Sequence, residues 1–261
     1  MKAGNEPSSK VVCISVVRDP EMYRRCVGDN PNVGACVLRP LDNQQENAPV
    51  SVQYNRFLDA YDYADPAWLF FCHEDFELLS PPGPYVGEAD PGCLYGPIGA
   101  WTKAYAGLVF AWRLSGSIVE SDKQGRGAVR IGTPASMGSP VETFDCQCLV
   151  VHSSLIAGTG LRFDPRLSFD LYVEDFCIQA RERHGVVSRI MPLPCRHWSH
   201  GSVGERYRDQ ESYLRAKYPS CCYTGTSSYD LGTPGLPRRC NRAAKVFLKA
   251  WLVRLRHLRR S

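Results

Sequence analysis

The chain has 261 residues and a mass of 29.2 kDa, and 44% of its residues are hydrophobic, 22% charged and 11% aromatic. These fractions are typical of a globular protein and exclude a disordered chain, a collagen-like fibre and a coiled coil. The net charge is +4, but nine Lys and Arg residues in segment 238–261 leave −5 on the rest, so charge alone excludes nucleic-acid binding by that body.

Apolar runs alternate with helically spaced apolar residues along the first 72 positions. They predict a strand at 10–17, a short helix that opens near Pro20, a strand at 35–38, a helix at 50–63 and a strand at 68–72. Such alternation is typical of a parallel sheet with crossover helices, and it predicts an α/β fold. The polar residues 1–9 are expected to be disordered.

The middle of the chain, residues 81–139, is rich in Gly and Pro, and its periodicity is weak. The later elements are predicted from shorter signals: strands at 107–114 and 128–131, an apolar run at 144–152, a helix at 176–184 and a strand at 186–193. The length predicts one large domain or two small ones, and we place the main domain at 10–220.

The C-terminal segment has a composition of its own. Residues 221–240 are expected to be a linker, and residues 241–260 an amphipathic basic helix with Trp251 as its aromatic anchor. Such a helix suits an anionic membrane surface. It would equally suit docking on its own domain or on a partner protein.

The twelve cysteines show no pair of CxxC motifs and no tight His/Cys cluster, and several lie in apolar runs. The N-terminus has no stretch that resembles a signal peptide, and no window reaches the roughly 18 apolar residues of a spanning helix. We therefore expect free thiols and a cytoplasmic location. The alternative, a disulfide-rich secreted domain, is disfavoured.

The first candidate site follows the apolar run 68–72. His73 and Asp75 lie at the end of this strand, where ligands bind in open α/β sheets. An imidazole and a carboxylate on the same side of the chain suit Mn²⁺ or Mg²⁺. The alternative is an ordinary solvated strand end.

Two further groups come later in the chain. Glu174 and Asp175 open a predicted helix, where a carboxylate can cap the helix or act as a general base. His197 and His200 follow the last strand, and either could complete a metal site, although a histidine is more often structural.

These groups occur in an order that resembles the GT-A glycosyltransferases, in the family-2-like branch typified by the streptomycin biosynthesis protein StrF domain. The resemblance covers about residues 10–218. It rests on five short motifs in sequence order: Tyr54-Asn55, Phe71-Cys-His-Glu-Asp75, Val141-Glu-Thr-Phe-Asp145, Tyr172-Val-Glu-Asp-Phe-Cys177 and His197-Trp-Ser-His-Gly-Ser202.

The resemblance implies a nucleotide-sugar donor and a divalent ion, Mn²⁺ or Mg²⁺. It assigns the metal to His73, Asp75 and a late histidine, His197 or His200. The other implied roles are donor binding by Asp42, Tyr54, Asn55, His73 and Asp75, acceptor binding by Asp145 and Trp198, and a catalytic base at Asp175 or Glu174. One departure from the family pattern is Val173, where the family has Asp.

The resulting hypothesis is an inverting, metal-dependent glycosyltransferase that uses a UDP-sugar or related donor and a glycan or lipid-linked acceptor at the inner face of a membrane. One alternative is a catalytically silent relative that binds a glycan or a partner, which Val173 motivates. Another is a nucleotidyltransferase, which would carry a Gly-rich basic loop after the first strand. Residues 18–22 contain no glycine, which counts against it.

Overall fold

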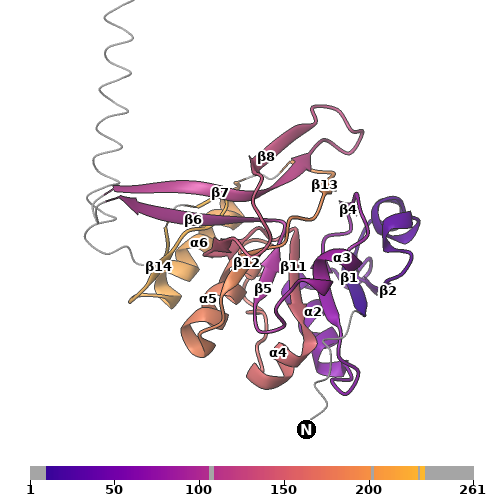
Figure 1. Cartoon of the computed structure of the whole chain (residues 1–261), viewed down its shortest axis with the longest axis horizontal. Coiled ribbons are helices and arrows are strands. Elements are labelled where there is room, and N and C mark those ends of the chain that lie inside the picture. The colour runs from indigo at the N-terminus through magenta and orange to yellow at the C-terminus, as the bar shows by residue number, and fades with distance from the viewer. Residues whose placement is uncertain (1–9, 106–108, 201–202, 229, 233–261) are drawn as a thin grey trace, which may run out of the picture.

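The computed structural model describes residues 10–105, 109–200, 203–228 and 230–232. Its elements form two layers of sheet with helices packed around them (Figure 1). Its α-helices are α1 (Pro20–Tyr23), α2 (Val50–Ala60), α3 (Gly83–Gly87), α4 (Ser153–Thr159), α5 (Tyr172–His184) and α6 (Glu205–Lys217). The chain is a mixed α/β protein, as the sequence predicts.

The larger sheet has seven strands in the order β2-β1-β3-β11-β5-β12-β9. In that order they span Val37–Asp42, Val11–Val17, Trp68–Cys72, Cys148–His152, Leu94–Gly96, Ser188–Ile190 and Pro140–Val141. The pairs β2–β1, β1–β3 and β5–β12 are parallel, whereas the three pairs made by β11 and β9 are antiparallel. The sheet is therefore mixed rather than wholly parallel.

Strands β1 and β3 explain why this sheet forms the core. Every residue of both strands is buried. Alternate side chains point to opposite faces, so that Ile14 and Phe71 join one apolar cluster, whereas Cys13 and Phe70 join another. The first cluster packs against α2, α4, α5 and α6, and the second packs against the smaller sheet. A strand buried on both faces needs a continuous apolar run, as these two have.

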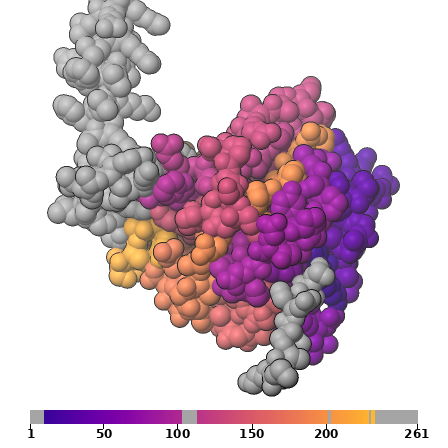
Figure 2. Space-filling view, in the orientation of Figure 1, coloured from indigo at the N-terminus to yellow at the C-terminus, as the bar shows by residue number. Residues whose placement is uncertain are grey.

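The smaller sheet has the order β10-β6-β7-β13-β4, with β8 paired to β7. In that order the five strands span Thr143–Phe144, Ile98–Tyr105, Val109–Glu120, Cys195–His197 and Phe76–Leu78, and β8 spans Val129–Thr133. Figures 1 and 2 show the segment that carries β13 between the β7–β8 hairpin and the N-terminal part of the chain.

This arrangement brings the ends of three strands together. His197 is in register with Glu120 at the end of β7 and with Phe76 at the start of β4. The backbone N–H of Trp198 donates to the carbonyl of Asp75 at 3.0 Å. The loop after β3 and the loop after β13 are therefore fixed side by side, although more than 120 residues separate them in the sequence.

The structure describes only part of the C-terminal segment. Part of the expected linker is ordered, because β14 (Cys222–Tyr223) and β15 (Leu231–Gly232) form a hairpin. The expected helix 241–260 and the expected disorder of residues 1–9 lie outside the described residues. All eleven cysteines of the described part are free. Among the described helices, none has the length and apolar character needed to cross a membrane.

Candidate functional site

A cavity of about 410 Å³ opens where the strand ends meet. Its lining carries many more carboxylates than cationic side chains. The carboxylates are Glu74, Asp75, Glu120, Asp145, Asp170 and Glu174, and the arginines are Arg18 and Arg206. A polyanionic ligand such as a diphosphate would be repelled by this lining unless a cation accompanied it.

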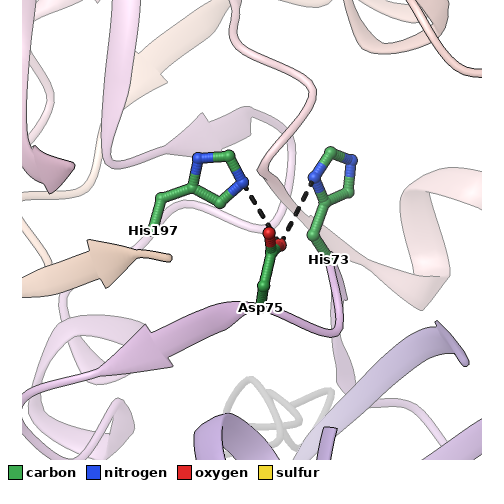
Figure 3. A group of neighbouring side chains, drawn as sticks. All are labelled: His73, Asp75 and His197. Atoms are coloured by element: carbon green, nitrogen blue, oxygen red, sulfur yellow. Dashed lines mark ion pairs between the residues drawn. The ribbon is translucent and has the colours of Figure 1, made fainter. Parts of the chain in front are cut away.

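Three side chains at the cavity converge on one point. The imidazoles of His73 and His197 flank the carboxylate of Asp75 (Figure 3), with His197 Nε2 at 3.2 Å and His73 Nδ1 at 3.9 Å from Asp75 Oδ1. One potential ligand atom from each residue lies within 4.8 Å of the others. Two imidazoles and a carboxylate suit Mn²⁺ or another first-row divalent ion. The sequence named His73, Asp75 and either His197 or His200, and among the described residues the structure groups His197 with the other two.

A tyrosine orients one of these three side chains. The hydroxyl of Tyr172 donates to the carbonyl of Cys146 at 2.8 Å, which uses its only proton. His73 Nε2, 3.0 Å from the same hydroxyl, must therefore be the donor in that contact. In the neutral ring, Nδ1 then carries a lone pair toward Asp75. A histidine whose second nitrogen is held in this way is the usual arrangement around a bound metal.

The protonation of the three groups follows from burial and their mutual contact. Burial raises the pKa of Asp75, but the hydrogen bond and charge of His197 outweigh it and hold the pKa below its usual value. Burial lowers the pKa of His197, and the hydrogen bond and charge of Asp75 outweigh it and raise the pKa. Burial is the main cause of the lowered pKa of His73. These opposite shifts favour a protonated His197 that donates to an ionised Asp75.

Metal binding at this site is expected to strengthen as pH rises. A cation that binds His197 Nε2 must displace the proton whose loss Asp75 opposes, whereas burial already favours the neutral form of His73. Affinity for Mn²⁺ should rise about tenfold per pH unit below the pKa of His197 and level off above it. Calorimetric titration of Mn²⁺ between pH 5.5 and 8.5 measures this slope. A flat profile would contradict a site that includes His197.

A second acidic group lies on the same cavity. Burial, and then the charge of Asp145, raise the pKa of Glu174 to about 8. The thiol of Cys146 donates to Glu174 Oε2 at 3.1 Å, and the hydroxyl of Thr226 donates to Asp145 Oδ2 at 2.8 Å. Leu171, with a φ of +59°, directly precedes α5. A carboxyl group that titrates near neutrality can both accept and release a proton.

Asp175 lies in a buried ion pair and not on the cavity wall. Its carboxylate is fully buried and paired with Lys217 Nζ at 2.7 Å. It also accepts hydrogen bonds from Tyr218 at 2.7 Å and from Gln179 at 2.6 Å. Among the described residues, those that line the cavity include Glu174 but not Asp175. Of the two carboxylates that the sequence left open, Glu174 is therefore the one that reaches the cavity.

The other expected site residues divide in the same way. Tyr54, Asp145 and His200 line the cavity, and the Tyr54 hydroxyl donates to the carbonyl of Cys72 at the end of β3. The remaining two of the expected donor-binding residues do not line it in the described part of the chain. Asp42 is exposed at the end of the edge strand β2, and the amide of Asn55 is bonded to the backbone of Phe163.

Trp198, expected on the acceptor side, also lies apart from the cavity lining that the structure describes. Its indole N–H donates to Glu77 at 2.9 Å, and the guanidinium of Arg25 lies 3.7 Å from the ring centroid. Arg196 also lies over the ring, at 4.8 Å. The ring is thereby held in a structural cluster.

Several cavity residues carried no signal in the sequence. Gln147, Tyr207 and Phe169 line the cavity, but the sequence did not single them out. The Phe169 ring stacks on His73 with centroids 5.4 Å apart. Phe169 is 41% exposed. Only the fold shows that these residues share one cavity.

Comparisons with known proteins find similarity among solved structures. No family model matches the chain, and no curated protein matches it. Among solved structures, it is similar to a crystal structure of GalNAc-T7 with UDP, GalNAc and Mn²⁺, with a TM-score of 0.40 and 9% sequence identity over 80% of this chain. The chain spans 44% of the length of that protein.

Proposed function

We propose that the chain is a metal-dependent glycosyltransferase that moves a sugar from a nucleotide-diphosphate sugar to an acceptor hydroxyl. The observation that carries the proposal is the convergence of His73, Asp75 and His197 at the edge of an acid-lined cavity. The order of the five sequence motifs, which resembles the GT-A glycosyltransferases, supports the same reaction class.

The roles of the residues follow from their chemistry. His73, Asp75 and His197 would hold the divalent ion, which neutralises the charge of the departing diphosphate. The carboxylates around them make a nucleotide diphosphate dependent on that ion for entry. Glu174, with a pKa of about 8, is suited to take the proton of the acceptor hydroxyl. Asp145 is the second candidate base, since it lines the same cavity.

The test is release of nucleoside diphosphate from a panel of UDP-, GDP-, dTDP- and ADP-sugars by the purified chain. Release is expected only with Mn²⁺ or Mg²⁺, and chelation should abolish it. Glu174→Gln should lower kcat by about 10²- to 10⁴-fold with little change in donor KM, because it removes the base but no donor contact. Glu182→Gln, at the other end of α5 and exposed, is the matched control and should act like wild type.

A second candidate is a protein that binds a nucleotide sugar without transferring it. Two observations favour it: Val173 is fully buried where the family has Asp, and Asp175 is occupied by its ion pair with Lys217. The same panel separates the two candidates. Metal-dependent donor binding without release by the wild-type chain would support the binding protein, and release that depends on Glu174 would exclude it.

A further inference from the structure

Two buried polar atoms on the cavity wall lack a hydrogen-bond partner among the described residues. They are Gln147 Oε1 and the hydroxyl of Tyr207, on side chains that are 5% and 7% exposed. A buried polar group left without a partner costs about 1–3 kcal/mol. Such atoms therefore indicate where a bound group completes the hydrogen bonding.

The orientation of the Gln147 amide is fixed by its other end. Its Nε2 lies 3.1 Å from Glu120 Oε1, and a carboxylate accepts but does not donate, so the nitrogen must face Glu120. The carbonyl oxygen is thereby left without a donor in the part of the chain that the structure describes. The backbone carbonyl of Gln147 accepts from the N–H of His73 at 3.1 Å, which places this residue beside the metal-binding group.

Tyr207 contributes from another element. It lies in α6, and its phenol hydroxyl can both donate and accept. Burial is the main cause of the raised pKa of Tyr207, so the hydroxyl stays protonated, and the charge of Glu174 raises that pKa further. A ligand that contacts both Gln147 and Tyr207 extends from the residue before β11 to α6.

The acceptor groups on this part of the cavity wall indicate which kind of ligand would bind there. Gln147 Oε1 and the carboxylates of Glu120 and Asp145 are acceptors, so they need a ligand that donates several hydrogen bonds. A diphosphate offers acceptors only, whereas a sugar ring offers hydroxyls that donate. We propose that Gln147 and Tyr207 hydrogen-bond hydroxyl groups of the transferred sugar and so help to select it. This inference rests on the proposed function and names the sugar-binding part of the same cavity.

The test compares each nucleoside diphosphate with its sugar conjugate by calorimetry in the presence of Mn²⁺. The pairs are UDP with UDP-glucose or UDP-galactose, GDP with GDP-mannose, and dTDP with dTDP-glucose; the pair with the tightest wild-type binding is used. Gln147→Leu and Tyr207→Phe are each expected to weaken binding of the sugar conjugate about tenfold and to leave binding of the free diphosphate unchanged.

Two controls make the result specific. Tyr213→Phe removes a hydroxyl from the same helix, where it donates to Asp164 at 2.7 Å, and should change neither affinity. Mn²⁺ affinity should be unchanged in Gln147→Leu. A fall in Mn²⁺ affinity would make Gln147 a metal ligand and would overturn the inference.

The remaining outcomes separate this inference from the proposed function. If the free diphosphate and the conjugate weaken equally in both variants, the two residues do not contact the sugar and the inference fails alone. If neither variant changes the affinity for the conjugate, it also fails alone. If no nucleotide binds to the wild-type chain with Mn²⁺, the proposed function fails, and the sugar-binding role fails with it.

Discussion

Asp75→Asn is expected to weaken Mn²⁺ binding by about 100-fold or more and to abolish metal-dependent release of nucleoside diphosphate. The carboxylate is the only one of the three converging groups that carries a negative charge, and both imidazoles face it. Replacement of partners one layer further from a metal already costs about 10- to 100-fold, and loss of a charged ligand costs more. Asn keeps the shape of the side chain but offers a neutral amide.

The measurement is a Mn²⁺ titration followed by electron paramagnetic resonance, with the same samples tested for donor turnover. Glu77→Gln is the matched control, because Glu77 lies two residues further along and accepts from the Trp198 indole away from the cavity. Its Mn²⁺ affinity should stay within about twofold of wild type. Mn²⁺ affinity within threefold of wild type in Asp75→Asn would place the metal elsewhere.

The fold of the variant should survive. Without the carboxylate, the raised pKa of His197 loses its cause, so the imidazole becomes neutral rather than a buried unpaired charge. The hydrogen bond from the Trp198 backbone goes to the backbone carbonyl of residue 75, which the substitution keeps. An unchanged circular dichroism spectrum would therefore accompany the loss of metal.

The apolar core was predictable because its strands are buried on both faces. The run 68–72 coincides with β3, and the run 10–17 differs from β1 by one residue. In the smaller sheet, the predicted strands 107–114 and 128–131 overlap β7 and β8, but β6 was not predicted, because residues 98–105 mix polar, Gly and apolar positions without a clear period. The long partners β6 and β7 take their regularity from pairing with each other, which periodicity does not report.

The grouping of His73, Asp75 and His197 was predictable because His73 and Asp75 come just after β3 and His197 is the last residue of β13, and sites in α/β proteins form at strand ends. Which of the two carboxylates, Glu174 or Asp175, reaches the cavity could not be predicted from the sequence. Neighbours on a helix point about 100° apart, so which of the two faces the cavity depends on how α5 packs in the fold. Gln147 was not predicted as a site residue for another reason. A glutamine in a sequence gives no indication of a site, and only the structure shows that its amide oxygen lacks a hydrogen-bond donor among the described residues.

Lys217→Met is expected to lower the free energy of unfolding by about 3–5 kcal/mol at pH 8, the largest stability effect among the ion pairs of the described residues. Lys217 Nζ contacts both Asp175 and Asp164, at 2.7 and 2.6 Å. Asp175 is fully buried, so removal of the cation leaves a buried carboxylate without its counter-charge. Urea denaturation measures the difference. Arg215→Met, on the same helix with a 40% exposed side chain, should cost less than about 1 kcal/mol.

The pH dependence of that defect tests its cause. Burial already raises the pKa of Asp175, and loss of Lys217 should raise it further. A carboxyl group with a folded-state pKa above its unfolded value destabilises the fold as pH rises from the unfolded value toward the folded one. The defect should therefore shrink at pH 5, where Asp175 is more protonated, and a second substitution, Asp175→Leu, should recover stability at pH 8. A defect that is equal at both pH values, and that Asp175→Leu does not relieve, would mean that Lys217 stabilises α6 through packing rather than through charge.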